Sequence, residues 1–172
     1  LRSGDHIVSS AFLFGNTNSL FNTFGHMDIN VSFVDATSVD AVAAAVTEKT
    51  RVVFVETIAN PRTQIADLAR IGEFCAQHGL MYVVDNTMTS PYLFQAKAVG
   101  ASLVVNSLTK YIGGHGNALG GATWSSPTFS DVTAVEPAGS LTAAERADSM
   151  STGALTDGSS AAKRSLPATD HE

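Results

Sequence analysis

Three polar residues of types that take part in catalysis stand at or just after the ends of short apolar runs. They are Asn60, Asp85 and Lys110, and about 25 residues separate each from the next, which is close to the length of one strand and helix unit. Glu56 stands at the end of the same run as Asn60. An open α/β sheet binds its ligand at the carboxyl ends of its strands. The spacing therefore predicts that carboxylates, an amide and a lysine amine converge at one edge of a sheet.

Hydroxyls and glycines accompany the lysine. Ser107 and Thr109 precede Lys110 in the run VVNSLTK. Five glycines crowd the loop that follows: Gly113, Gly114, Gly116, Gly120 and Gly121. Glycine lacks a Cβ, so the backbone of this loop can turn closely around a ligand.

Pyridoxal 5′-phosphate is a group that uses all of these residue types together. Its aldehyde condenses with a lysine amine, its ring nitrogen needs a carboxylate to stay protonated, and its phosphate needs hydrogen-bond donors. Lys110 is the candidate for the covalent bond, and Asp85 is the candidate partner of the ring nitrogen. Asn60 could donate to the ring oxygen beside the aldehyde. Ser107 and Thr109 would flank the phosphate.

Each of these residues, taken alone, has a simpler interpretation. Most lysines that follow a strand are solvated, which would explain Lys110. Asp85 could cap the next helix. Asn60 precedes a proline, as turn residues often do. Ser107 and Thr109 alternate at a strand end, which also suits positions that face solvent. The glycine loop is not a dinucleotide-binding loop, because its spacing is wrong and no helix clearly follows it.

The elements that must position these residues are predicted from apolar patterning. Short β-rich runs alternate with helical patterns, which predicts an α/β fold with a mainly parallel sheet and helices on both faces. The predicted strands are 6–10, 31–35, 51–57, 80–86 and 102–108. Helices are predicted over 38–49, with Ser38 as N-cap, and over 65–78, followed by Gly79 as a C-terminal stop.

Composition argues against several classes of partner. The net charge is −6 and no cluster of Lys or Arg is present, so nucleic acid is not expected as a partner. No apolar run approaches the roughly 20 residues that cross a bilayer, and the first residues lack the apolar core of a signal peptide. We therefore predict a cytoplasmic protein with no membrane partner. The single cysteine, Cys75, cannot form a disulfide within the chain, and no metal site is predicted.

The last part of the sequence has a different composition. Residues 125–172 are dominated by Ala, Ser, Thr, Gly and Asp, with Phe129 as the one aromatic residue. Such a segment does not easily offset the roughly 1–2 kcal/mol per residue that backbone ordering costs. We expect residues 1–124 to be the central part of the cofactor-binding α/β domain and residues 125–172 to be a divergent, disordered tail.

The run VVDNTMTSPYLFQAKAVGASLVVNSLTKYIGGHGNALGG at 83–121, together with VFVETIANP at 53–61, closely resembles the Cys/Met-metabolism family of pyridoxal-phosphate enzymes. The family includes O-acylhomoserine sulfhydrylases, cystathionine γ-synthases and methionine γ-lyases. The similarity runs from about Gly4 to Ala122. It implies an incomplete large domain of the aspartate-aminotransferase type (fold type I), in a homo-oligomeric parent protein, a tetramer.

The resemblance also implies roles for individual residues. By motif, Lys110 matches the lysine that bonds the cofactor and Asp85 matches the partner of its ring nitrogen. Asn60 matches the asparagine near the cofactor oxygen, and Ser107 and Thr109 match the hydroxyls on the phosphate side.

Two departures from the family pattern stand out. The family segment LYGGT reads LFGNT here, so Phe14 keeps the ring that stacks on the cofactor and loses the tyrosine hydroxyl. The chain is also expected to be a central piece of a protein more than twice as long, without a preceding phosphate-binding segment and without the C-terminal domain that holds the arginine for the substrate carboxylate.

The function that the resemblance implies is γ-replacement on an O-acylhomoserine, by sulfhydrylation or transsulfuration in methionine and cysteine metabolism. The substrate would be a small amino acid and the cofactor pyridoxal 5′-phosphate. Elimination of the methionine γ-lyase type is one alternative. A truncated remnant without catalytic activity is the other.

Overall fold

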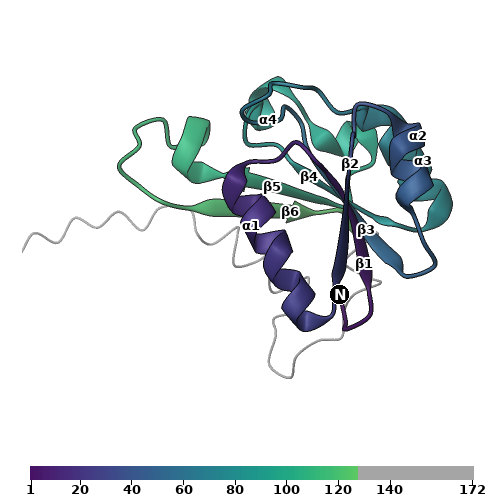
Figure 1. Cartoon of the computed structure of the whole chain (residues 1–172). Coiled ribbons are helices and arrows are strands. Elements are labelled where there is room, and N and C mark those ends of the chain that lie inside the picture. Colours follow the sequence, from purple (N-terminus) through teal and green to yellow (C-terminus); the bar gives the residue numbers. More distant parts are fainter. Residues whose placement is uncertain (128–172) are drawn as a thin grey trace, which may run out of the picture. The chain divides into compact units, whose positions relative to one another are not determined.

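A computed structural model describes residues 1–127 of the chain, in which strands alternate with helices (Figure 1). The strands are β1 (His6–Ser10), β2 (Asn30–Val34), β3 (Thr50–Glu56), β4 (Met81–Asp85), β5 (Leu103–Ser107) and β6 (Gly121–Ser125). The helices are α1 (Gly15–Phe24), α2 (Val39–Ala45), α3 (Leu68–His78) and the short α4 (Ser90–Leu93). Tighter or wider helical turns are η1 (Gly25–Met27), η2 (Ala96–Val99) and η3 (Leu108–Ile112).

The six strands form one sheet in the order β2-β1-β3-β4-β5-β6. Strands β1 to β5 are parallel and β6 runs antiparallel to β5. All five predicted strands are present, and the predicted parallel sheet is confirmed. The sixth strand was not predicted, because it begins at a glycine and all five of its residues are exposed. Ser125 belongs to this strand, so the expected domain boundary at residue 124 falls inside an element. The rest of the predicted tail, residues 128–172, lies outside the described residues.

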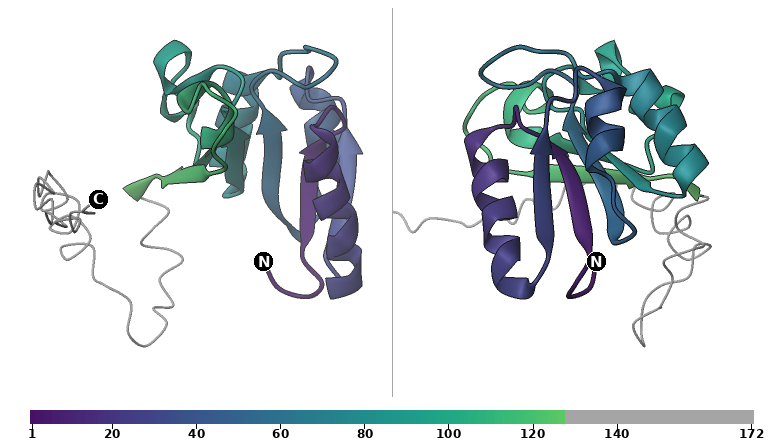
Figure 2. Two further views of the ribbon diagram at one scale, coloured as in Figure 1. Left: turned by 90° about the vertical axis from the view of Figure 1, so that its left-hand side faces the viewer. Right: turned by 45° about the vertical axis from the view of Figure 1, so that its right-hand side comes forward.

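As predicted, helices cover both faces of the sheet (Figure 2). On one face, α2, α3 and η2 bury side chains against β1, β3, β4 and β5. On the other face, Phe21 of α1 packs edge-on against Phe54 of β3, with the ring centroids 5.0 Å apart. The helix α1 was not predicted. Its sequence is mostly polar, and Phe21 is its one buried residue.

The predicted helix boundaries were partly wrong. Ser38 caps α2 as expected, since its hydroxyl accepts a hydrogen bond from the Asp40 N–H at 3.3 Å. The helix nevertheless ends at Ala45, because Val46 adopts an extended conformation. Helix α3 starts at Leu68 instead of residue 65. It ends at His78 as predicted, and the following Gly79 has a φ of 63°, the left-handed conformation that favours glycine.

Gly72 of α3 lies where the helix touches the turn η2. A Cβ at this position would stand 1.8 Å from the carbonyl oxygen of Val99 and 3.3 Å from the ring of Tyr82, which is fully buried. The backbone of Val99 cannot move aside as easily as the end of a flexible side chain could. Gly72→Ala is therefore expected to lower the free energy of unfolding by about 3 kcal/mol, as measured by urea denaturation.

Gly25→Ala is the matched control for this substitution. No atom lies within 4 Å of a Cβ built at Gly25, and its φ of −57° suits any residue. We expect its free energy of unfolding to stay within about 1 kcal/mol of that of the unsubstituted chain. If the two variants had equal midpoints of urea denaturation, the close approach of α3 and η2 would be contradicted.

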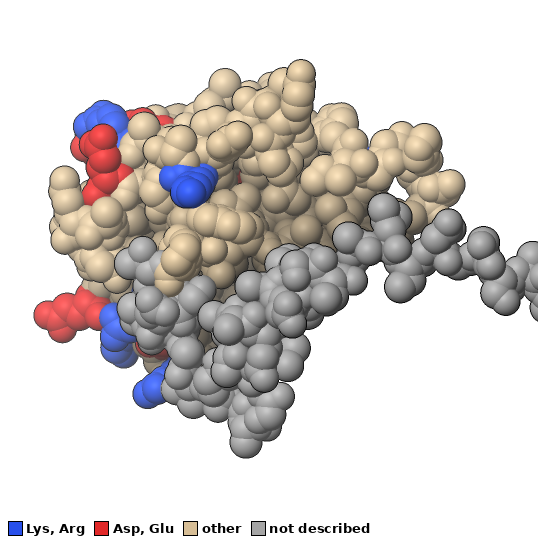
Figure 3. Space-filling model, turned by 180° about the vertical axis from the view of Figure 1, so that it is seen from behind, with Lys and Arg blue, Asp and Glu red and all other residues tan. Residues whose placement is uncertain are grey.

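Charged side chains are sparse and mixed in sign on the face that Figure 3 shows. Within residues 1–127, none of the helices has the length and apolar character that crossing a membrane requires. The same part of the chain holds no group of three or more His, Cys, Asp or Glu side chains placed to bind a metal ion.

Candidate active site

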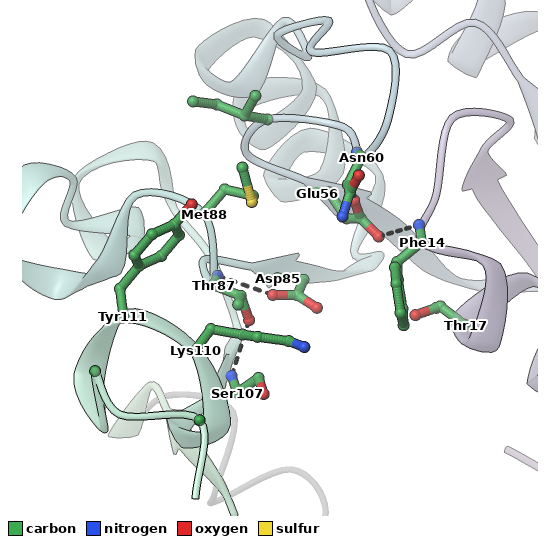
Figure 4. Close-up of a pocket in the computed structure, with 13 residues that line it drawn as sticks. Phe14, Thr17, Glu56, Asn60, Asp85, Thr87, Met88, Ser107, Lys110 and Tyr111 are labelled. Atoms are coloured by element: carbon green, nitrogen blue, oxygen red, sulfur yellow. Dashed lines mark hydrogen bonds between the residues drawn. The ribbon is translucent and has the colours of Figure 1, made fainter.

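A cavity of about 640 Å³ lies at the carboxyl ends of β3, β4 and β5 (Figure 4). Each of these strands ends in a residue that lines it: Glu56, Asp85 and Ser107. The lining residues are Phe14, Thr17, Glu56, Ile58, Asn60, Asp85, Thr87, Met88, Ser107, Lys110, Tyr111, Gly114 and Gly116. The structure thus brings together five of the six residues predicted from the sequence, with Thr109 as the exception.

Lys110 is presented by the turn η3, which follows β5 directly. The turn has the wide spacing of a π-helix, and Lys110 departs from helical geometry within it, with φ −93° and ψ −121°. The N–H of Gly113 closes the turn by donating to the carbonyl of Leu108 at 2.8 Å. A Cβ on Gly113 would stand 2.5 Å from that same oxygen. Glycine is therefore required at position 113 for the turn that carries Lys110.

The amine of Lys110 has an aromatic neighbour. Its Nζ lies 5.9 Å from the centre of the Phe14 ring, within the range of a cation–π contact. In residues 1–127, the two ion pairs are Arg51–Asp5 and Arg70–Asp67, so Lys110 has no carboxylate partner there.

Asp85 is the last residue of β4 and is half-buried. Its Oδ1 accepts a hydrogen bond from the Thr87 N–H at 2.9 Å. No Lys or Arg of the described chain lies within 4.0 Å of its carboxylate. Asp85 therefore offers a fixed negative charge to whatever occupies the cavity.

Ser107 and Thr109 have different environments. The backbone N–H of Ser107 donates to Oγ1 of Thr87 at 2.8 Å, and Ser107 itself lines the cavity. Thr109 does not line it. Its hydroxyl donates to the Gly120 carbonyl at 3.3 Å and accepts from the Gly120 N–H at 3.0 Å. The structure thus places Thr109 as a support for the end of the glycine loop, and its contact with a phosphate stays a prediction.

Phe14 and Asn60 enter the cavity from two loops that are far apart in sequence. Phe14 precedes α1 and is 42% exposed, so a face of its ring is free to contact a ligand. Asn60 is exposed in the loop after β3, where its bond to Pro61 is cis. Both backbone N–H groups donate to one carboxylate, that of Glu56.

Glu56 and Thr87 are residues of this site to which sequence reasoning gave no role. Glu56 has both oxygens in hydrogen bonds, and burial raises the pKa of its carboxyl. The Thr87 N–H donates a hydrogen bond to Asp85 Oδ1, and Thr87 Oγ1 accepts one from the Ser107 N–H. The one signal in the sequence for either residue is its position. Glu56 ends a buried strand, and Thr87 comes two residues after Asp85.

These residues fit pyridoxal 5′-phosphate. The cavity volume is in the range of small-molecule sites. The amine of Lys110 and the carboxylate of Asp85 line the cavity, and neither has an ion-pair partner in residues 1–127. The exposed ring of Phe14 and the polar side chain of Ser107, at the end of β5, line it as well. These groups match the aldehyde, the ring nitrogen, the planar ring and the polar substituents of that cofactor.

Comparison with known proteins gives a consistent result. Residues 1–156 match the family model described as Cys/Met metabolism PLP-dependent enzyme. The match continues beyond Ala122, where the resemblance inferred from motifs ends.

Similar proteins carry names of several related enzymes. A cystathionine γ-synthase of Mycobacterium leprae is 42% identical over 71% of this chain and 32% of its own length. An O-acetyl-L-homoserine sulfhydrylase of Leptospira meyeri is 37% identical over 80% of this chain and 33% of its own length. A canavanine γ-lyase of Rhizobium leguminosarum is 41% identical over 70% and 31%. The chain spans about a third of the length of these relatives.

A solved structure is similar as well. The crystal structure of cystathionine γ-lyase from Lactobacillus plantarum complexed with L-serine superposes with a TM-score of 0.73 at 32% sequence identity. The similarity covers 76% of this chain and 35% of that one.

Proposed function

This chain belongs to the Cys/Met-metabolism family of pyridoxal-phosphate-dependent enzymes, and from that membership we propose that the protein catalyses replacement at the γ-carbon of an O-acylhomoserine. Three predictions are confirmed: the family, the fold type I α/β domain and the pyridoxal-phosphate dependence of the family. The individual reaction is a proposal, because the similar proteins include a synthase, a sulfhydrylase and lyases.

The observation that carries the proposal is the meeting of Lys110 and Asp85 in one cavity, neither of them in an ion pair within residues 1–127. Lys110 would bond the cofactor and Asp85 would hold a proton at its ring nitrogen. Phe14 would stack on the ring, Asn60 would donate to the ring oxygen, and Ser107 would face the phosphate.

When bound, pyridoxal 5′-phosphate supplies an aldehyde that bonds amines and a protonated ring that withdraws electrons from the carbon next to the amine. The protein residues supply orientation and proton transfer. Lys110 Nζ would take the proton from the substrate Cα and return it, since a lysine amine can serve as a general base. Asp85 would hold a proton at the ring nitrogen of the cofactor. The substrate loses its γ-acyloxy group as a carboxylate, and a sulfur nucleophile bonds the γ-carbon.

Elimination is the second candidate, because a canavanine γ-lyase and a cystathionine γ-lyase are among the similar proteins. In that reaction no sulfur nucleophile adds, and hydrolysis releases a 2-oxo acid and ammonia. The predicted homotetramer, the cytoplasmic location and the amino-acid substrate belong to the proposal of an active enzyme. A chain without catalytic activity is the third candidate.

The test is a cofactor titration followed by a product assay. We expect the whole protein to bind pyridoxal 5′-phosphate with a change in visible absorbance, and to convert O-acetylhomoserine and sulfide to homocysteine in excess over 2-oxo acid. Excess 2-oxo acid would favour elimination instead. An absence of cofactor binding would contradict the proposed function.

A further inference from the structure

The carboxylate of Glu56 joins two loops that border the cavity. Its Oε1 accepts a hydrogen bond from the Phe14 N–H at 2.7 Å, and its Oε2 accepts one from the Asn60 N–H at 3.3 Å. Phe14 lies 42 residues before Glu56 and Asn60 lies four residues after it. Glu56 is 6% exposed, so water offers its carboxylate little alternative to these two N–H donors.

Glu56 also stands beside Asp85. The two residues are register partners on the parallel strands β3 and β4, so their side chains leave the sheet on the same face. Burial raises the pKa of the Glu56 carboxyl, the two backbone hydrogen bonds oppose this, and the nearby charge of Asp85 raises it further. The other titratable groups that line the cavity are Lys110 and Tyr111.

We propose that Glu56 is a positioning residue that fixes Phe14 and Asn60 for cofactor binding. With each oxygen bound to one N–H, the carboxylate sets where the Phe14 ring and the Asn60 amide stand, on the side of the cavity away from Met88 and Tyr111 (Figure 4). The inference rests on the proposed function, since it assigns Phe14 and Asn60 to the cofactor.

A catalytic role fits Glu56 less well. Both of its oxygens are already in hydrogen bonds, and the side chain is buried. Lys110, by contrast, is exposed and has no hydrogen bond or ion pair to another side chain of residues 1–127. The group that moves protons is therefore Lys110, and Glu56 acts through the two residues that it holds.

The first test needs no substitution at Glu56 and no cofactor. In ¹H–¹⁵N NMR spectra recorded from acid to neutral pH, the amide signals of Phe14 and Asn60 should shift with one common midpoint, above the ordinary midpoint of a glutamate. Asp85→Asn should lower that midpoint, because it removes the neighbouring negative charge. Independent titration of the two amides, or no titration, would overturn the inference.

The second test measures cofactor affinity. Glu56→Gln keeps the shape of the side chain but has one acceptor oxygen in place of two, so one loop is released. We expect the dissociation constant for pyridoxal 5′-phosphate to rise about tenfold, because the released side chain must be ordered on binding. Glu73→Gln, at an exposed position of α3, is the control and should not change it.

The outcomes separate the two proposals. Equal affinity of Glu56→Gln and the unsubstituted chain would overturn the positioning role and leave the proposed function intact. Failure of the unsubstituted chain to bind cofactor would overturn the proposed function, and the amide titration would still decide whether Glu56 holds both loops.

Discussion

The Lys110→Ala protein is expected to lose covalent capture of pyridoxal 5′-phosphate completely. Lys110 is the lysine that lines the cavity, and its Nζ lies 5.9 Å from the centre of the Phe14 ring. Borohydride reduction of the loaded, unsubstituted protein should fix the cofactor on the peptide that contains Lys110. In the variant, mass spectrometry of the same peptides should show no label above background.

Two further variants make this result specific. Lys110→Arg keeps the positive charge, but a guanidinium does not form the covalent bond, so it should bind the cofactor reversibly and take no label. Lys97→Ala removes an exposed lysine of η2 that does not line the cavity, and it should be labelled normally. Label on Lys97 or Lys49 in the unsubstituted protein would show that the assignment of Lys110 is wrong.

The parts of the fold that could be predicted are those with a local signal. Strands β1 to β5 are apolar runs, and burial on both faces makes such runs continuous in β3 and β4. The exposed strand β6 pairs with β5 through backbone hydrogen bonds, which every residue type except proline can form. Its residues carry no corresponding apolar pattern, and tertiary pairing alone makes it a strand.

The same distinction applies to the site. Asp85 and Lys110 stand directly at the ends of strands, so their convergence follows from the topology of a parallel sheet. The bridge from Glu56 to Phe14 joins residues 42 positions apart, and no periodicity marks such a contact. Thr109 directly precedes Lys110 in the run VVNSLTK, yet in the wide turn its hydroxyl forms hydrogen bonds with the backbone of Gly120. Motif spacing gives the neighbourhood of a residue and leaves the direction of its side chain open.

Asp85→Asn is expected to lower turnover by about a thousandfold with little change in the fold. The asparagine Oδ1 can still accept the hydrogen bond that Thr87 N–H donates to Asp85 at 2.9 Å, so the turn after β4 should persist. The negative charge is lost, and an amide cannot hold a proton on the cofactor ring nitrogen. Removing one partner of a desolvated charge pair costs about 2–5 kcal/mol. An increase of about 4 kcal/mol in the activation free energy lowers the rate about a thousandfold.

The measurement that isolates this effect combines kcat, labelling and unfolding. Asp85→Asn should still be labelled at Lys110 by borohydride, because the covalent bond does not need the carboxylate, while kcat falls. Its thermal unfolding should stay close to that of Asp40→Asn, which removes an exposed carboxylate of α2 that does not line the cavity. If turnover were unchanged, Asp85 would not be the partner of the ring nitrogen. If labelling were lost together with turnover, the carboxylate would act in cofactor binding and not in the chemical step.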